Sequence, residues 1–139
     1  MEQENFRSNC PISSGLDLFG DKWSLLIIRD MMYYGERTFK DFAQAAEKIS
    51  TARLSDRLSR LEKLGIITKS NHPTNKKVFL YNLTERGLDL TPLIAEYIRW
   101  SNKHLPDHIS DVAKAMATQL EKDREGTIQK FMEGKYFNR

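Results

Sequence analysis

The segment from residue 50 to residue 83 changes its hydrophobic period once, and this change limits the folds that the chain can adopt. Ser50 can cap a helix that Gly65 ends. The apolar residues between them recur at helical spacing and are Leu54, Leu58, Leu61 and Leu64. After Gly65, "IITKS" and "VFLYNL" favour β-strands, and "NHPTNKK" between them suits a turn. The segment predicts an amphipathic helix followed directly by a β-hairpin with a basic tip.

Three helices are expected before this segment. "CPISSGLDLFG" predicts a short helix closed by Gly20, and Asp21 can cap the next helix, which Gly35 ends. Thr38 can cap a third helix. Its apolar stripe would consist of Phe39, Phe42, Ala43 and Ala46. Aromatic residues on such faces are usually core, so we expect Trp23, Phe39 and Phe42 to be buried.

Two helices are expected after the hairpin. Thr84 can cap a long amphipathic helix that runs to Trp100, and Pro92 predicts a bend or a late restart within it. A last helix is expected from Ile109, with Gly126 near its far end. Its apolar face would consist of Val112, Ala113, Met116 and Leu120.

Together these elements predict an α+β fold that is mostly helical, a winged helix-turn-helix with extra terminal helices for dimerisation. A chain of 139 residues has the length of one domain. Within that single domain, 1–139, we expect residues 10–100 to form the winged helix-turn-helix core. Residues 101–139 would form a carboxy-terminal helical extension.

Surplus apolar surface predicts self-association. A small winged-helix core is filled by the first four helices and the hairpin, so the stripes on the last two helices need another partner. A second copy related by a two-fold axis supplies one. The residues expected at this homodimer interface are Leu16, Tyr97, Ile98, Val112, Met116 and Leu120.

Positive charge is concentrated in one part of the chain. Residues 48–77 contain eight Lys or Arg against Asp56 and Glu62, a net of +6, while the whole chain carries +3. Such a block indicates a surface that binds a polyanion, here double-stranded DNA. A solvated helix face, or a winged helix that serves only as a protein interaction module, is the alternative, but neither needs this local charge.

The expected DNA contacts lie on the amphipathic helix and on the hairpin. Residues 51–57 would read base edges, while Arg60 and Lys63 would hold phosphates. The hairpin tip would reach the backbone or a minor groove. The full set is Ser50, Thr51, Ala52, Arg53, Ser55, Asp56, Arg57, Arg60, Lys63, His72, Asn75, Lys76 and Lys77.

Other classes of protein find little support. No phosphate-binding glycine loop or nucleophile elbow is present, so we expect no enzyme and no cofactor. His104 and His108 have the i, i+4 spacing of a metal pair, but Pro106 disrupts the helix between them, so no metal is expected. The sequence lacks a long apolar run and has one cysteine, so we expect a cytoplasmic protein with no membrane partner.

At this point a family resemblance can be recognised. The runs "CPISSGLDLFGDKWSLLIIRDM", "RTFKDF", "LSDRLSRLEKLGII" and "YNLTERGLDLTPLIAEYIRW" occur in this order. Together they resemble bacterial transcription regulators of the HxlR type, relatives of the MarR group. The resemblance implies a homodimer, clasped by terminal helices, that binds a pseudo-palindromic operator and responds to a metabolic or electrophilic effector.

Cys10 has two interpretations. A lone cysteine is most often a small buried hydrophobic residue. The resemblance implies instead a sensor of oxidants or reactive carbonyls, because some relatives use a cysteine at this Cys-Pro position. The positive end of the following helix would favour the thiolate. Both interpretations stay open at the level of sequence.

Overall fold

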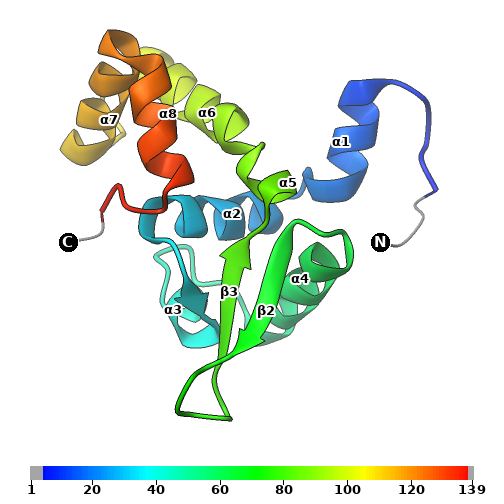
Figure 1. The fold of residues 1–139 in the computed structure, drawn as a ribbon. Coiled ribbons are helices and arrows are strands. Elements are labelled where there is room, and N and C mark those ends of the chain that lie inside the picture. Colours follow the sequence, from blue (N-terminus) through cyan, green and yellow to red (C-terminus); the bar gives the residue numbers. More distant parts are fainter. Residues whose placement is uncertain (1–4, 138–139) are drawn as a thin grey trace.

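The computed structural model describes residues 5–137, and Figure 1 shows how their elements are arranged. The helices are α1 (Pro11–Phe19), α2 (Lys22–Tyr34), α3 (Phe39–Ala43), α4 (Thr51–Lys63), α5 (Glu85–Leu88), α6 (Thr91–His104), α7 (Asp111–Lys122) and α8 (Arg124–Met132). The strands are β1 (Arg37–Thr38), β2 (Ile67–Asn71) and β3 (Phe79–Leu83). The fold is a mostly helical winged helix-turn-helix, as predicted.

The predicted helix caps are confirmed. The carboxylate of Asp21 accepts the amide of Ser24 at 3.0 Å, and the hydroxyl of Ser50 accepts the amide of Arg53 at 3.2 Å. Thr38 forms a full capping box at the start of α3. Gly65 has a φ of 74°, a left-handed conformation that suits glycine and turns the chain from α4 into the hairpin.

The hairpin belongs to a three-stranded antiparallel sheet with the order β1-β3-β2. In its register Lys69 lies opposite Tyr81 and Asn71 opposite Phe79. The sequence did not predict β1, because two residues are too few to show an alternating pattern. Pairing with β3 is what makes these residues a strand.

The third helix is shorter than predicted. It ends at Ala43, so Ala46 lies outside it and is exposed. Instead of continuing as a helix, the chain turns through Lys48, whose φ is 57°. A tertiary contact accompanies this turn, because the guanidinium of Arg29 on α2 binds both carboxylate oxygens of Glu47, at 2.7 and 2.9 Å.

The helix expected from Thr84 is divided in two. Thr84 caps only the four-residue α5, and α6 begins at Thr91 with Pro92 in its first turn. The late restart predicted from Pro92 is therefore confirmed, since a proline lacks the amide that the interior of a helix would need.

The last predicted helix is also divided, into α7 and α8. Asp123 breaks the helix with φ −150° and ψ 82°, and its carboxylate accepts the amide of Gly126 at 3.0 Å as the cap of α8. A Cβ atom on Gly126 would lie 2.1 Å from an Asp123 carboxylate oxygen. Gly126 therefore lies inside α8, where the cap needs its small size, and not at the end of a helix.

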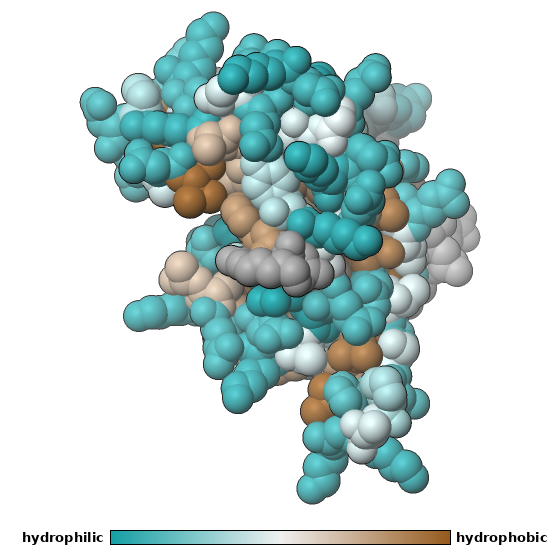
Figure 2. Space-filling view, turned by 60° about the vertical axis from the view of Figure 1, so that its left-hand side comes forward, coloured by the Kyte–Doolittle hydropathy of each residue, from teal (hydrophilic) through white to brown (hydrophobic). Residues whose placement is uncertain are grey.

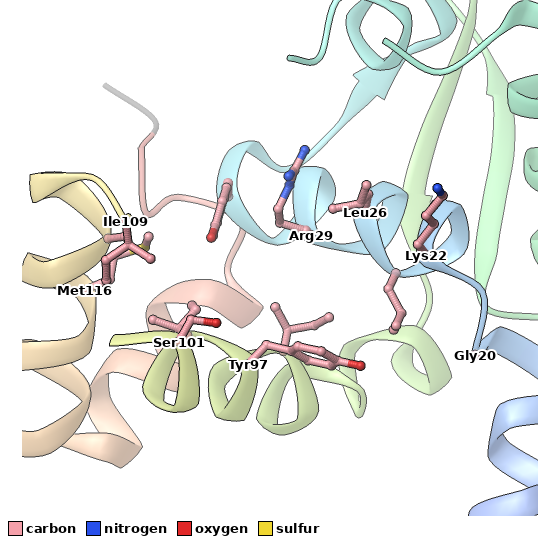
Figure 3. A pocket seen from close by; sticks show the side chains of 13 residues that line it. Gly20, Lys22, Leu26, Arg29, Tyr97, Ser101, Ile109 and Met116 are labelled. Carbon is pink, nitrogen blue, oxygen red and sulfur yellow. The ribbon is translucent and has the colours of Figure 1, made fainter. Parts of the chain in front are cut away.

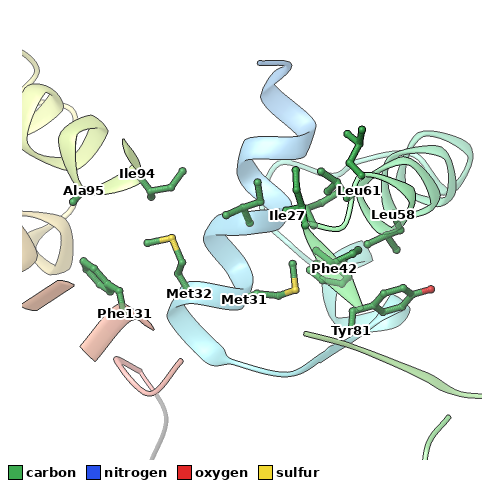
Figure 4. Close-up of a cluster of buried hydrophobic side chains, with 14 of the residues drawn as sticks. Ile27, Met31, Met32, Phe42, Leu58, Leu61, Tyr81, Ile94, Ala95 and Phe131 are labelled. Atoms are coloured by element: carbon green, nitrogen blue, oxygen red, sulfur yellow. The ribbon is translucent and has the colours of Figure 1, made fainter. Parts of the chain in front are cut away.

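Helix α2 lies between the two halves of the core, as Figure 4 shows. Ile27 and Met31 face Leu58, Leu61, Phe42 and Tyr81 of the winged-helix half, while Met32 faces Ile94, Ala95 and Phe131 of the carboxy-terminal half. The predicted burial of Phe42 is confirmed at 1% exposure. Trp23 and Phe39 are only half-buried, because they lie at the edges of these contacts.

The carboxy-terminal helices fold back onto their own chain. Helix α7 packs on α6, and α8 packs on α6, α7 and α2. Met116 and Leu120, which were expected in the dimer interface, are 4% exposed each and belong to the core of the single chain. That expectation was wrong, because α8 and α6 supply the apolar partner that the sequence alone assigned to a second copy.

None of the helices in residues 5–137 has the length and apolar character needed to cross a bilayer.

Candidate nucleic-acid interface

Helix α4 turns its leucine side into the core and its polar side to solvent. Leu54, Leu58 and Leu61 are at most 2% exposed. The polar side is exposed, as its predicted contact with DNA requires. The exposed residues of the predicted set are Ser50, Thr51, Ala52, Arg53, Ser55, Asp56 and Lys63. Buried leucines fix the rotation of the helix, so these side chains are presented together.

Arg57 departs from the predicted contact set. Its guanidinium binds the Asp21 carboxylate at 2.9 Å and also pairs with Asp56. Burial on its own would raise the pKa of Asp21, but hydrogen bonds from Ser24 and Arg57 outweigh it and hold that pKa below its usual value. Arg57 therefore ties α4 to the start of α2. The sequence could not show this, because Asp21 lies 36 positions away.

Arg60 is also directed toward its own chain. Its guanidinium donates to the backbone carbonyl of Asp17 at 3.0 Å, and its side chain is half-buried beside α1. Asp17 in turn binds Arg7 at 2.6 Å. The phosphate contact predicted for Arg60 therefore does not match its position, whereas Lys63, on the same helix, is exposed.

The wing is the hairpin of β2 and β3, residues 67–83. His72 and Asn75, which were predicted to contact DNA from the wing, form hydrogen bonds within its turn. The Nδ1 atom of His72 accepts the amides of Thr74 and Asn75, both at 3.1 Å, so the ring proton must lie on Nε2. The amide oxygen of Asn75 accepts the amide of Lys77 at 3.1 Å. These bonds close the tip of the hairpin, and Lys76 and Lys77 are left exposed on it. Figure 2 shows the wing projecting at the lower end of the molecule, with hydrophilic side chains at its tip.

A groove of about 870 Å³ separates α4 from the wing and adds residues that the sequence analysis missed. Ser59 of α4, Lys40 of α3 and Lys69 of β2 line it. The ammonium of Lys69 lies 4.1 Å from the ring centroid of Phe79, which holds it over the strand. The sequence analysis counted Lys69 only in the net charge of residues 48–77. It could not place Lys40 near DNA, because α3 meets the wing only in the folded chain.

Cys10 is exposed and occupies the residue before α1, with Pro11 as the first residue of the helix. Its side chain makes no capping hydrogen bond. The interpretation of Cys10 as a buried hydrophobic residue is therefore wrong for the single chain.

Within residues 5–137, no group of His, Cys, Asp and Glu is arranged to hold a metal ion.

An apolar stripe lies on the outer side of α6. Tyr97 is 57% exposed, and Leu93 and Trp100, one turn to either side, are 40% and 54% exposed. Leu16 of α1 and Val112 of α7 are exposed as well, while Ile98 is half-buried. The predicted dimer interface included Tyr97 but neither Leu93 nor Trp100, although their spacing of i, i+4 and i+7 places the three side chains on one face.

Comparison with known proteins gives one family. A family model described as "HxlR-like helix-turn-helix" matches residues 18–109. A curated relative, the HTH-type transcriptional regulator YodB of Bacillus subtilis, is 32% identical over 95 residues, which cover 68% of this chain and 84% of YodB. An uncharacterized HTH-type transcriptional regulator of Synechocystis, sll1512, is 35% identical over 85 residues, 61% of this chain. The chain spans about three fifths of the length of that relative and of one from Mycobacterium tuberculosis.

Solved structures agree with the fold. A MarR-family regulator from Porphyromonas gingivalis W83 matches with a TM-score of 0.63 and 26% identity, over 73% of this chain and 99% of its own. Reduced YodB matches with a TM-score of 0.57 and 31% identity, over 70% of this chain and 95% of its own. YodB has also been solved after diamide treatment and with a bound quinone.

The role of His72 in the wing turn can be measured without DNA. His72→Ala removes the acceptor, whereas His72→Asn places an amide oxygen at the same distance along the side chain. A typical hydrogen bond within a protein is worth about 1 kcal/mol, so exchange of the Thr74 and Asn75 amides should accelerate about 5-fold in His72→Ala. His72→Asn should keep the rates near those of the wild type.

Hydrogen exchange followed by NMR gives these rates, with the amide of Arg53, capped by Ser50, as an internal reference. Equal protection of the two amides in His72→Ala and the wild type would show that the ring does not hold the turn.

Proposed function

Because this chain belongs to the HxlR-like helix-turn-helix family, we propose that it is a sequence-specific DNA-binding transcriptional regulator that acts as a homodimer in the cytoplasm. The observation that carries the proposal is the joint exposure of α4 and the wing. Arg53, Ser55 and Lys63 on α4, and Lys76 and Lys77 on the wing, are all exposed, and Ser55 and Lys77 line the groove between the two elements. An enzyme finds no support in relatives that are named as regulators.

The exposed residues would divide the work of DNA recognition. α4 would enter the major groove, where Arg53 in its first turn is placed to read base edges. The lysines at the rim of the groove and on the wing would contact phosphates. Arg57 and Arg60 would contribute indirectly, by fixing α4 against α2 and α1.

The homodimer would use the exposed stripe of α6 together with α1. Helix α1 has no buried residue, and Ile12 and Leu16 on it are 74% and 55% exposed. Apolar side chains exposed on both helices favour a self-complementary contact with a second copy. The two α4 helices would then face successive major grooves of a pseudo-palindromic operator, with half-sites about 10 base pairs apart or a multiple of that.

Cys10 is a candidate redox or electrophile sensor in this dimer. Its exposed position beside α1 leaves the thiol open to reagents, and the relative YodB has been solved in diamide-treated and quinone-bound forms. The sequence contains one cysteine, so oxidation would join the Cys10 thiols of two copies. Diamide would accept the two electrons and two protons released as the S–S bond forms.

DNA binding is tested by two substitutions with different expected results. Lys77→Ala removes one phosphate contact, so it should reduce the slope of log K against log salt by about one and weaken all sequences alike. Arg53→Ala should cost about 1 to 3 kcal/mol on the preferred site and relax its sequence requirement.

Fluorescence anisotropy with a site selected from genomic fragments and with random duplex measures both effects. Lys114→Ala, on the exposed side of α7, is the matched control for loss of a positive charge. An unchanged salt slope in Lys77→Ala, with binding that ignores sequence in the wild type, would favour a protein interaction module.

The dimer is tested by charge on the apolar stripe. Leu93→Glu and Trp100→Glu place a carboxylate on an exposed side chain, so the single chain should stay folded while the contact between copies is lost. Sedimentation at micromolar concentration should show a dimer for the wild type and for Lys114→Glu, and a monomer for the two stripe variants. A monomeric wild type would refute the arrangement.

The sensor is tested by comparing the wild type with Cys10→Ser. Diamide should convert the wild type into a disulfide-linked species of doubled mass on a non-reducing gel and change its affinity for the selected site, while Cys10→Ser should do neither. If both proteins lose or keep DNA binding alike, the thiol has no role in sensing.

A further inference from the structure

A cleft of about 420 Å³ lies between α2, α6 and α7, apart from the surface assigned to DNA. Figure 3 shows it as an elongated space, with Gly20 and Lys22 toward one end and Ile109 and Met116 toward the other. Tyr97 and Ser101 of α6 line one side and Leu26 of α2 the other. Its volume falls in the range of roughly 300–1,000 Å³ that is typical of small-molecule sites.

The carboxy-terminal extension builds one wall of this cleft. The match to the family model ends at residue 109, so α7 lies outside it. Ile109, Ala113 and Met116 belong to this last wall. Ala113 has a small side chain, and a larger one at that position would fill space that the cleft now occupies. The cleft therefore depends on α7, a helix that the family match does not include.

The charge of the lining is one-sided. Among residues 5–137, no carboxylate lines the cleft, and the charged residues of its lining are Lys22 and Arg29. Arg29 is already neutralised, because its guanidinium binds Asp30 at 2.7 Å and Glu47 at 2.7 Å. Lys22 lines one end of the cleft, is exposed and forms no ion pair within residues 5–137. Figure 3 shows its ammonium directed away from α6, and it lies 5.2 Å from the Trp23 ring centroid. The uncompensated charge at this cleft is therefore that of Lys22.

We propose that this cleft binds an amphipathic monocarboxylate with an extended apolar body. The apolar body would lie between Leu26, Ile98 and the α7 wall, where it displaces water from apolar surface. The carboxylate would stay at the open end beside Lys22, where it keeps contact with water, and the exposed Lys22 side chain would turn toward it to form an ion pair. An ammonium head group would meet only positive charge at the same place.

Binding would affect the DNA-contacting half through α2. Helix α2 forms one side of the cleft and also carries Ile27 and Met31, which pack against α4 and its neighbours. A ligand that separates α2 from α6 and α7 would therefore shift how α4 is held relative to the second copy. This regulatory consequence rests on the proposed function, whereas ligand binding itself does not.

Calorimetry on the full chain in the absence of DNA tests the binding. The probes are octanoate, octanol, octylammonium and acetate, which separate the contributions of charge and apolar length. We expect saturable binding of one octanoate per chain, with octanol at least 5-fold weaker and with no measurable binding of octylammonium or acetate.

Two variants locate the site. Ala113→Phe should fill the cleft and weaken octanoate at least 10-fold. Lys22→Gln should lower the affinity for octanoate to that for octanol and leave octanol unchanged. Lys114→Gln, the next residue along α7 but exposed and outside the lining, is the control and should bind like the wild type. Circular dichroism of each variant verifies that it is folded.

Three results would overturn the proposal: no saturable octanoate binding, binding that Ala113→Phe leaves intact in a folded protein, or a preference for octylammonium. Binding that occurs only in the monomeric Trp100→Glu variant would also overturn it, because the cleft would then be filled by the second copy. If octanoate binds as expected but does not change DNA affinity, the site stands and only its regulatory role fails.

Discussion

Helix α2 is buried on two opposite sides, and the positions of α4 and of the carboxy-terminal helices follow from this. One side packs against the leucines of α4 and against Phe42 and Tyr81, and the other packs against α6 and α8 through Met32. A helix covered on both sides cannot rotate without opening one of the two contacts. The polar face of α4 and the orientation of the carboxy-terminal helices are therefore set relative to the same rigid element.

Positive charge in this chain serves two different purposes. Arg29, Arg57 and Arg60 bind carboxylates or a backbone carbonyl of their own chain and hold elements together. The planar guanidinium suits such contacts, because it presents several donors in a fixed geometry. In the part of the chain that the structure describes, the exposed Lys63, Lys76 and Lys77 form no ion pair, so their ammonium groups can adjust to phosphates that vary in position. The net charge of the segment overstates how much of it is available to DNA.

The carboxy-terminal extension determines which apolar side chains are buried within the single chain and which stay exposed for a second copy. Met116, Leu120 and Phe131 complete the core of the single chain, and the surface left over for a second copy is the outer side of α6 together with α1. Because α7 stands beside α6 without closing onto α2, the same packing leaves an open cleft between them. Core formation, the candidate dimer surface and the candidate ligand site thus arise from one arrangement of three helices.

The sequence by itself determined the elements whose signals are local. Asp21, Thr38 and Ser50 cap the helices predicted for them, Gly65 ends α4, and the change of period after it gives the hairpin. These features depend on residues within a few positions of each other. Tertiary structure alone decided the pairing of β1, the partners of Arg57 and Arg60, and the groove that includes Lys40. Each of these joins or adjusts segments according to contacts in space, and periodicity along a chain carries no information about which distant charge or strand a side chain will meet.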